Sequence, residues 1–364
     1  MAKSYVMITG GDGYLGLQIA SRYLERTNEA VLLWVHAKEQ PEVQAKQQRV
    51  AARLGPCADR LRFGCGDLTD EQPFEGIEPE RVKMIIHSAA VTRFNIDADT
   101  AQHVNVEGTA KLLAFARRCR SLQALGLMST VYASGLRTGP IREVAFDDSG
   151  GFANHYERSK WQAETLLMSR FAELPWRVLR VATAIADDAS GTVTQQNAFH
   201  NTLKLFFYGL LSLIPGKPQT PLYFVTGRFV ADAVFELMQQ PANQMIYHVA
   251  HTRQESASLG ELIDSAFEVF LQEEDFKQRR LLKPLYTDAE AFDLLVQGVT
   301  SFGGGVVNQA VSSVAPFARQ LFVDKTIENQ HLVERFSAYR APDPRQLVRS
   351  TCDYLVRTRW GRTR

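Results

Sequence analysis

Tyr156 and Lys160 are the residues of this sequence whose types and spacing best fit proton transfer. They lie four positions apart in the run Asn-His-Tyr-Glu-Arg-Ser-Lys, and residues four apart share one face of a helix. A tyrosine hydroxyl, whose pKa is about 10 in a free side chain, can give its proton to a carbonyl oxygen that receives hydride. A neighbouring ammonium favours the phenolate and lowers that pKa. The pair therefore predicts a reductase or dehydrogenase site, in which Lys160 could also hold the ribose of a nucleotide cofactor.

A second hydroxyl is expected from the run Met-Ser-Thr-Val-Tyr, at the end of an apolar segment over residues 122–129. Side chains at the carboxyl end of a parallel strand point into the crevice where open α/β sheets bind ligands. Thr130 would then contact the substrate oxygen, with Ser129 beside the cofactor. The two roles exchange if the alternation of the strand turns Ser129 towards the crevice.

Gly10, Gly13 and Gly16 directly follow an apolar segment at residues 5–9 and open an amphipathic segment at 14–26. Glycines at this spacing let the chain turn sharply and let backbone N–H groups approach a pyrophosphate at the amino end of a helix. A glycine motif alone is weak evidence, but the strand–turn–helix context strengthens it. The segment predicts a dinucleotide site to which three flanking residues also contribute: Thr9, Tyr14 and Leu15.

The residues that would contact the adenosine ribose lie roughly 20 positions after Gly16. His36 and Lys38 stand there, without a carboxylate. A carboxylate would bond the free 2′-hydroxyl of NAD and repel a 2′-phosphate, whereas these two side chains do the opposite. They predict NADP(H), unless Lys38 is a solvated loop lysine. Asp67, followed by Leu68, is placed to bond the adenine amino group or to close a turn.

The elements that must position these residues alternate between short apolar runs and amphipathic stretches. Strands are expected at residues 5–9, 31–35, 61–63, 82–87, 122–129 and 176–182, with helices at 14–26, 42–54, 100–118 and 156–171. Apolar strands that alternate with helices indicate a parallel sheet covered on both faces. The predicted fold class is α/β, a doubly wound Rossmann-type sheet with a smaller, mainly helical C-terminal region. The nucleotide-binding domain is expected at residues 1–182, with sheet elements returning at about 222–250, and the substrate region at 183–221 and 251–364.

Composition narrows the class of protein further. The 364 residues are 45% hydrophobic and 22% charged, with a net charge of +1, so the basic excess that holds nucleic acid is missing. The four cysteines form no CxxC pair, so neither a metal centre nor a disulfide framework is expected. The first residues lack the order of a signal peptide. The longest uncharged runs are too short, or too diluted by glycine and polar residues, to span a bilayer. We expect a cytoplasmic protein.

With these residues in place, the chain resembles the extended short-chain dehydrogenase/reductases, and more narrowly the branch of fatty acyl-CoA reductases and thioester reductase domains. The resemblance covers residues 4–255 and rests on the strings ITGGDGYLG, GDLTDEQPFEGI, IIHSAAVTRF, NVEGTAKLL, STVYASG and YERSKWQAE. It implies a catalytic triad of Thr130, Tyr156 and Lys160, with NADP(H) as cofactor. It also places four further residues beside the cofactor: Ser88, Ala89, Ala90 and Asn105.

The resemblance implies an acyl thioester substrate, carried by CoA or by a separate acyl-carrier protein. Three departures bear on this expectation: His36 stands where the family usually has arginine, Arg180-Val181 replaces Arg-Pro, and Ala186 replaces a glycine. Two alternatives stay open. One is an oxidoreductase, epimerase or dehydratase that acts on another carbonyl or alcohol, such as a sugar nucleotide, a sterol-like alcohol or a polyketide. The other is a catalytically silent NADP-binding module.

Three further segments each allow two interpretations. The apolar run at residues 203–214 suits either a lipid-like acyl chain or a plain core helix. Residues 294–318 carry no charge and contain three consecutive glycines. They would form a flap over the acyl chain or against a membrane surface, or two packed helices. The C-terminal tail is expected to form either a frayed, solvated terminus or a docking patch for a partner with phosphate or acidic groups. Its relevant residues are Arg357, Arg359, Trp360, Arg362 and Arg364.

Overall fold

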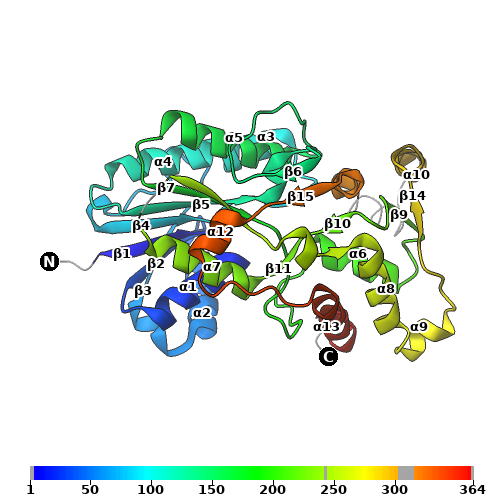
Figure 1. The fold of residues 1–364 in the computed structure, drawn as a ribbon. Helices are drawn as coiled ribbons and strands as arrows, with labels where there is room; N and C mark the ends of the chain where they lie inside the picture. Colours follow the sequence, from blue (N-terminus) through cyan, green and yellow to red (C-terminus); the bar gives the residue numbers. More distant parts are fainter. Residues whose placement is uncertain (1–3, 242–243, 302–314, 362–364) are drawn as a thin grey trace.

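A seven-stranded parallel sheet forms the centre of the molecule in the computed structural model (Figure 1), which describes residues 4–241, 244–301 and 315–361. The strand order is β12-β7-β5-β4-β1-β2-β3, so the order reverses between β1 and β4. This reversal is the place where doubly wound sheets bind ligands. The strands are β1 (Tyr5–Thr9), β2 (Ala30–His36), β3 (Leu61–Gly66), β4 (Val82–His87), β5 (Ala124–Thr130), β7 (Trp176–Val181) and β12 (Met245–Val249). The predicted fold class is confirmed.

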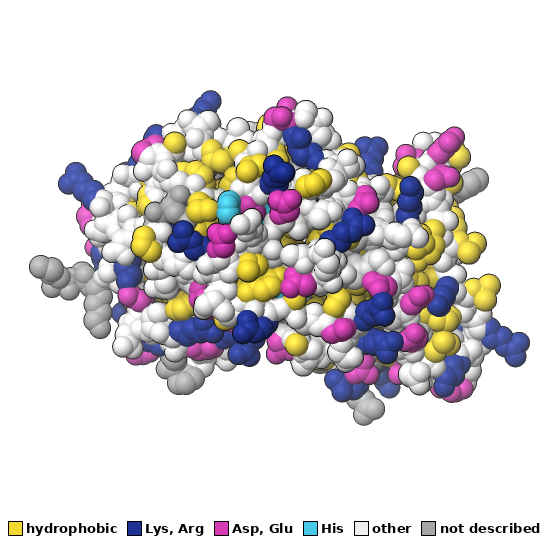
Figure 2. Space-filling view, in the orientation of Figure 1, with side chains coloured by type: hydrophobic (Ala, Val, Ile, Leu, Met, Phe, Trp, Pro, Cys, Tyr) yellow, Lys and Arg dark blue, Asp and Glu magenta, His cyan; other side chains and the backbone are white. Residues whose placement is uncertain are grey.

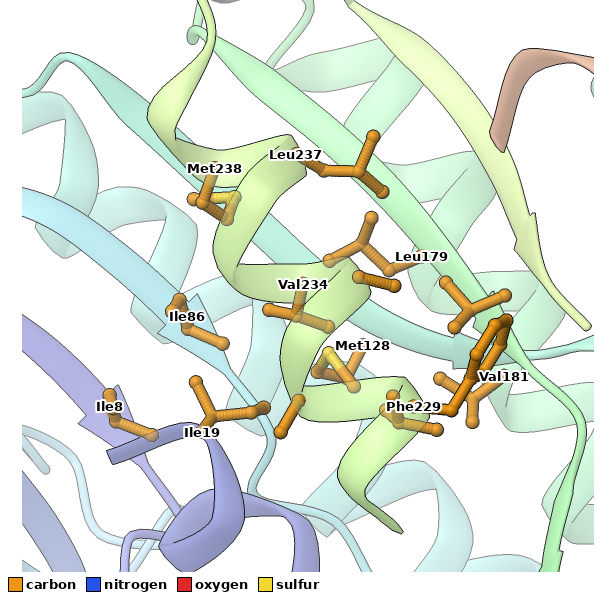
Figure 3. Close-up of a cluster of buried hydrophobic side chains, with 14 of the residues drawn as sticks. Ile8, Ile19, Ile86, Met128, Leu179, Val181, Phe229, Val234, Leu237 and Met238 are labelled. Atoms are coloured by element: carbon orange, nitrogen blue, oxygen red, sulfur yellow. The ribbon is translucent and has the colours of Figure 1, made fainter. Parts of the chain in front are cut away.

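Helices cover both faces of the sheet (Figure 1). One face carries α1 (Tyr14–Arg26), α2 (Gln40–Leu54) and α7 (Gly227–Gln239), and the other carries α4 (Gly108–Arg118) and α5 (His155–Arg170). The alternation of β1 produces this division, because successive side chains point to opposite faces. Ile8 packs with Ile19 and Val234 in the core under α1 and α7 (Figure 3). Met7 packs with Leu112 in the core under α4 and α5.

The helix expected at residues 100–118 is interrupted. It consists of α3 (Ala98–Thr100), a π-helical segment (Ala101–Glu107) and α4. A π-turn is wider than an α-turn and is often found at functional sites. Asn105 lies within it and is buried, with consequences for the site described below.

A second core lies beside the sheet and is built largely of aromatic rings. Phe206 and Phe207 on α6 (Ala198–Phe207) pack against Phe270 on α8 (Leu259–Phe270) and Phe276 on α9 (Glu274–Gln278). The apolar run at 203–214 is therefore core packing, and it gives no support to a lipid-like substrate. Trp360 is also buried in this core, with its ring 5.7 Å from that of Phe207. The expectation of a frayed terminus is wrong up to this residue, because the ring has an apolar site to fill.

Short strands and helices complete the fold. Four two-stranded pairs join distant segments: β6 (Gly139–Ile141) with β15 (Lys325–Ile327), β8 (Thr183–Ala186) with β11 (Phe224–Thr226), β9 (Leu213–Pro215) with β14 (Leu285–Thr287), and β10 (Pro221–Leu222) with β13 (Ala257–Ser258). The remaining α-helices that the structure bounds are α10 (Ala289–Ser301), α12 (Gln330–Arg335) and α13 (Pro344–Arg357).

Two predictions fall partly outside the described residues. Residues 303–305, the proposed hinge of a flap, lie outside them, as do Arg362 and Arg364 of the tail. Arg357 pairs with Asp353 at 3.9 Å.

None of the helices in the described ranges combines the length and apolarity needed to cross a bilayer. Basic and acidic side chains are interspersed over the face shown in Figure 2.

Candidate active site

The glycine loop after β1 forms a close cradle with the end of β4. Gly10 has φ +64°, and a side chain there would come within 2.9 Å of the Ala89 backbone. A side chain at Gly16 would lie 2.2 Å from the Gly10 carbonyl oxygen. Gly13 is the residue before α1, and among the described residues no side chain caps this helix. Its first backbone N–H groups therefore face outwards, as pyrophosphate binding requires. The residues present fit a dinucleotide.

A buried chain of hydrogen bonds joins the ends of β1 and β4 to the helix α4 next to the cradle. The Thr9 hydroxyl lies 2.7 Å from Nδ1 of His87 and accepts a bond from the Ala89 amide. Nε2 of His87 lies 3.1 Å from the Thr109 hydroxyl, which itself donates to a carbonyl oxygen. His87 must therefore carry its proton on Nε2. Burial, together with the charge of Lys160, lowers the pKa of His87 to about 3. Sequence reasoning missed this neutral histidine, although it ends an expected strand.

Asn105 does not present a free amide to a cofactor. Its Oδ1 accepts from the Val91 amide at 2.9 Å, and its Nδ2 donates to the Val91 carbonyl and to the Ser159 hydroxyl. Asn105 thus ties the segment after β4, which includes Ser88, Ala89 and Ala90, to the helix α5.

Three other residues predicted to contact the cofactor are engaged within the protein. The Tyr14 hydroxyl donates to the Ala186 carbonyl at 2.9 Å, which joins α1 to β8. Leu15 packs against the core under α1. Leu68 lies in the opposite core, and a side chain at Gly108 would meet it at 2.8 Å. What these side chains contribute is packing that fixes the loops around the cradle.

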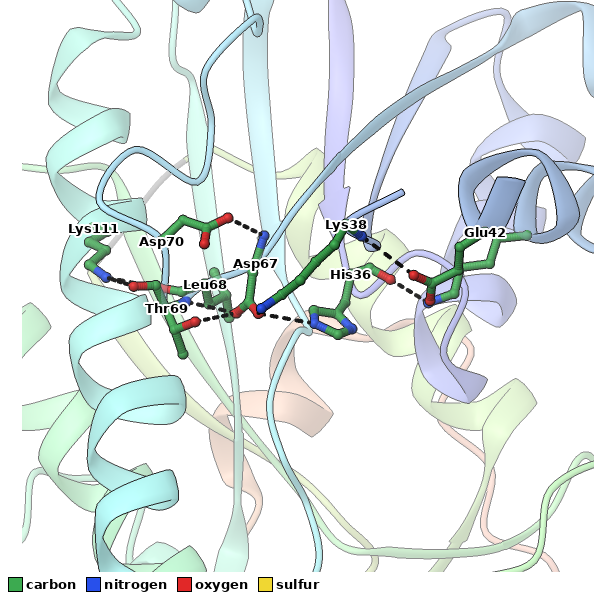
Figure 4. A network of polar contacts seen from close by, with 9 residues as sticks. His36, Lys38, Glu42, Asp67, Leu68, Thr69, Asp70 and Lys111 are labelled. Carbon is green, nitrogen blue, oxygen red and sulfur yellow. Dashed lines mark hydrogen bonds and ion pairs between the residues drawn. The ribbon is translucent and has the colours of Figure 1, made fainter. Parts of the chain in front are cut away.

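At the carboxyl end of β2, His36 and Lys38 lie on either side of Asp67 (Figure 4). Nζ of Lys38 lies 3.0 Å and Nε2 of His36 lies 3.3 Å from Oδ2 of Asp67. Oδ1 accepts from the Thr69 amide and hydroxyl. Burial acts to raise the pKa of Asp67, but the bonds from Thr69, Lys38 and His36 hold it well below its usual value. Both side chains therefore already share a carboxylate.

Lys46 is a third cation at this end that sequence reasoning missed. Its Nζ lies 3.1 Å from Asp12 in the glycine loop and 3.3 Å from Glu42, and it donates to the His36 carbonyl. Lys46 therefore joins α2 to the glycine loop and to the end of β2. Its position one helical turn after Glu42 was the available signal.

Thr130 and Tyr156 meet at the carboxyl end of β5. The Thr130 hydroxyl lies near enough to that of Tyr156 to act on its pKa, and the exposed fractions of the two residues are 5% and 9%. Ser129 points to the other face of the strand and donates to Glu164. The alternation of β5 therefore turns Thr130, not Ser129, towards the tyrosine.

Burial has the largest influence on the pKa values of Tyr156 and Lys160. It raises the pKa of Tyr156 well above its ordinary value, the charge of Glu157 adds to the rise, and the bond with Thr130 opposes it. In the protein by itself the pKa of Tyr156 is raised and not lowered as expected, because desolvation of the phenolate dominates. Burial also lowers the pKa of Lys160 to about 8, against the charge of Glu164. The site holds a protonated tyrosine at neutral pH, as a proton donor requires.

A buried ion pair lies under these groups. Arg180 and Glu164 are essentially inaccessible, and the guanidinium approaches the carboxylate at 2.7 Å. Arg180 also donates to the Val144 carbonyl and stacks over the Phe146 ring at 4.1 Å. Glu164 thus accepts bonds from both Arg180 and Ser129, which fixes α5 against the end of β5.

An aromatic wall stands beside the tyrosine. The Phe94 ring packs against Tyr156 at 5.7 Å and stacks on Phe317 at 5.2 Å, and Phe317 contacts Tyr132 at 5.4 Å. Phe94 follows the cradle segment in sequence, whereas Phe317 comes from the C-terminal region. The wall gives the site an apolar side next to its two hydroxyls.

A doubly wound sheet, a glycine cradle and a buried Thr-Tyr-Lys cluster define an extended Rossmann fold of the short-chain dehydrogenase/reductase class. Residues 8–234 match the model of a family of NAD-binding domains described as "male sterility protein". The match covers more than half of the chain, which therefore belongs to that family.

Curated relatives match over parts of their length. Fatty acyl-CoA reductase 2 of Arabidopsis thaliana is 40% identical over 67 residues, which cover 18% of this chain and 11% of that protein. A carboxylic acid reductase of Segniliparus rugosus is 29% identical over 203 residues, 48% of this chain and 17% of that protein. D-erythronate dehydrogenase of Cupriavidus necator is 27% identical over 236 residues, 63% of this chain and 70% of that protein. The chain thus spans a small part of the first two relatives.

Among solved structures, the terminal R domain of the myxalamid PKS-NRPS pathway superposes with a TM-score of 0.78 at 19% identity. The superposition covers 99% of this chain and 92% of that domain. At this identity the likeness is one of fold.

Proposed function

We propose that the protein is an NADPH-dependent reductase of acyl thioesters, which it converts to an aldehyde and a free thiol. The observation that carries the proposal is the burial of Thr130, Tyr156 and Lys160 together at the carboxyl edge of the sheet, with the Thr130 hydroxyl near enough to act on the pKa of Tyr156. Family membership and the relatives that are acyl reductases support it.

The residues of the chain divide the chemistry among them. The hydroxyls of Thr130 and Tyr156 would both donate to the carbonyl oxygen of the substrate, which gains stabilisation as negative charge develops. Tyr156 holds a proton there at neutral pH, since burial raises its pKa. Lys160, charged below about pH 8, offers an ammonium to the sugar of the nucleotide. When bound, the reduced nicotinamide supplies hydride to the acyl carbon.

The bond changes balance as follows. The acyl carbon gains hydride and its oxygen gains the proton of Tyr156. The C–S bond then breaks as the C=O bond re-forms, and the hydroxyl proton passes to the sulfur, which leaves as thiol. Tyr156 regains a proton from solvent. A second hydride would convert the aldehyde to an alcohol.

The choice of NADPH over NADH rests on His36 and Lys38 at the adenosine end. A 2′-phosphate would take the place of Asp67 as the partner of these cations, and phosphate is a good partner for clustered cations. Asp12, Glu42 and Asp67 supply negative charge nearby, so we expect a moderate preference.

The thioester would be carried by CoA or by a separate carrier protein. The glycine cradle and the catalytic cluster would not contact the carrier itself. Only its pantetheine arm, with the acyl group, would reach the site past the aromatic wall. Phe94 and Phe317 would then line the side of the site next to the acyl group.

The test is oxidation of NADPH and NADH with a panel of acyl-CoAs, aldehydes, ketones and nucleotide sugars. Turnover of thioesters with release of one thiol per NADPH in the first step supports the proposal. Turnover of a nucleotide sugar or a hydroxy acid alone would replace it with the dehydrogenase or epimerase alternative. Binding of NADPH without turnover of any member would favour the silent module.

A further inference from the structure

The segment over residues 315–327, here the C-terminal strap, crosses from the second core to the catalytic half of the molecule. It contains Phe317 of the aromatic wall and ends in β15, which pairs in parallel with β6. Two of its polar side chains are buried: Gln320 and Lys325 are each 5% exposed. Neither is part of a motif, and the proposed chemistry assigns neither a role.

Gln320 reaches the residue that follows the catalytic tyrosine. Its Nε2 donates to Glu157 Oε2 at 2.9 Å and to the Gly135 carbonyl at 3.2 Å. Glu157 has no measurable exposure and also accepts from the Ala153 amide and the Asn154 side chain at the start of α5. Gln320 therefore holds the first turn of the helix that carries Tyr156.

Lys325 reaches the loop that follows the strand carrying Thr130. Its Nζ donates to the Ser134 hydroxyl at 3.1 Å and also to the Gly135 carbonyl. Gly135 has φ +64°, and a side chain there would lie 2.0 Å from the Gly151 carbonyl oxygen. The backbone at Gly135 is thus held in one conformation, with its carbonyl presented to both strap residues.

Opposite charges lie buried together in this cluster. Lys325 and Glu157 act on each other through their charges. Burial of such a pair is weak evidence for a gain in stability, because desolvation offsets the attraction. A role in fixing one particular arrangement is the better explanation.

We propose that Gln320 and Lys325 are positioning residues that hold Thr130 and Tyr156 in register for proton transfer. The inference rests on the proposed function, in which these two hydroxyls meet the same carbonyl oxygen. Gly135 follows Thr130 by one short turn and Glu157 follows Tyr156 directly, so the strap bonds both elements at once. A displacement of about 1 Å at a reacting group can lower a rate by roughly a hundredfold.

The experiment compares Gln320→Met and Lys325→Met with wild type, in the full chain with NADPH and the thioester found above. We expect kcat to fall by about tenfold to a hundredfold, with the KM for NADPH within about twofold, because the cradle does not touch the strap. Gln196→Met and Lys283→Met are the controls: both side chains are exposed, and they contact the second half of the molecule, where Gln196 bonds the Trp360 carbonyl and Lys283 pairs with Asp264. The controls should keep wild-type kcat.

A readout without turnover separates this inference from the proposed function. Hydrogen exchange of the wild type should show protection of residues 131–136 and of residues 153–157. Gln320→Met should release both segments together, while Gln196→Met releases neither. Gln320→Met carries the test if Lys325→Met fails to fold. Unchanged kcat in a folded Gln320→Met variant, or exchange that stays as in wild type, would overturn the inference even if thioesters are reduced.

Discussion

The buried Thr-Tyr-Lys cluster and the exposed end of β2 differ in how water reaches their polar groups. Thr130 and Tyr156 are 5% and 9% exposed, and Ser129 and Arg180 both bond Glu164 next to them. At the end of β2, the side chains of His36 and Lys38 are 61% and 65% exposed and share the carboxylate of Asp67. The groups of the cluster are therefore desolvated, whereas those at the end of β2 are screened by water.

This difference shows for which charged groups a role can be inferred from the sequence. At the buried end, few partners are possible, so each group has a defined role. At the exposed end, Lys38, which is predicted to meet a phosphate, is already paired with Asp67. A third basic residue, Lys46, which sequence reasoning missed, is paired with Asp12 and Glu42. Substitutions at the two ends should therefore differ strongly in effect.

The largest effect is expected from Arg180→Met, which leaves Glu164 buried without its counter-ion. Removing one partner of a buried pair costs about 3–5 kcal/mol of unfolding free energy. Arg345→Met, which removes an exposed partner of Glu261, should cost less than about 1 kcal/mol. Urea unfolding measures both. Equal losses would show that the pair under the site is no more important than a surface one.

Tyr156→Phe should lower kcat by at least about a hundredfold, because it removes the proton donor and keeps the ring. NADPH affinity, measured by fluorescence titration, should be nearly unchanged. Tyr339→Phe, which removes a hydroxyl bonded to Glu255 away from the site, is the control and should keep turnover. Near-normal turnover by Tyr156→Phe would place the chemistry elsewhere.

The pH dependence should follow Lys160. Burial favours its neutral form and lowers its pKa to about 8, so the ammonium is present below that pH and is lost as the pH rises through it. We expect kcat/KM to fall by about tenfold per pH unit above roughly pH 8. Burial also lowers the pKa of Lys325, so the profile of Lys325→Met decides between the two lysines. A falling limb that disappears in this variant would assign it to Lys325.

The smallest effect is expected at the exposed end. His36→Ala combined with Lys38→Ala should abolish a preference for NADPH over NADH of about 1.5 kcal/mol, near the lower end for a charged hydrogen bond. Lys283→Ala, which breaks another exposed lysine–aspartate pair, should leave it unchanged. Binding of both cofactors to wild type is measured by titration. Equal affinities in wild type would refute the prediction from the end of β2.

The sheet and the cradle could be predicted because their signals are local. Apolar runs alternate with amphipathic segments, and the spacing of Gly10, Gly13 and Gly16 directly follows a strand. The resemblance already assigned Thr130 to the triad, whereas strand alternation alone left Ser129 open until β5 showed which side chain faces Tyr156.

What could not be predicted depends on partners far away in the chain. Asn105 is in a family motif, yet its amide is used by Val91 and Ser159, and no spacing announces the latter contact. The arginines around Trp360 suggested a solvated end, whereas Phe207, more than 150 positions earlier, supplies its packing site. Gln320 likewise has no signal without the fold that brings it to Glu157.

The central claim is hydride transfer to the acyl carbon of a thioester, and isotopic labelling tests it most directly. The protein is incubated with an acyl-CoA and NADPH that carries deuterium at both positions of the nicotinamide C4, and the products are analysed by mass spectrometry and thiol titration. The account predicts an aldehyde with one deuterium on its carbonyl carbon and one equivalent of free CoA, or the doubly labelled alcohol if reduction continues. Oxidation of NADPH with no label in an aldehyde or alcohol, or with no release of CoA, would contradict it.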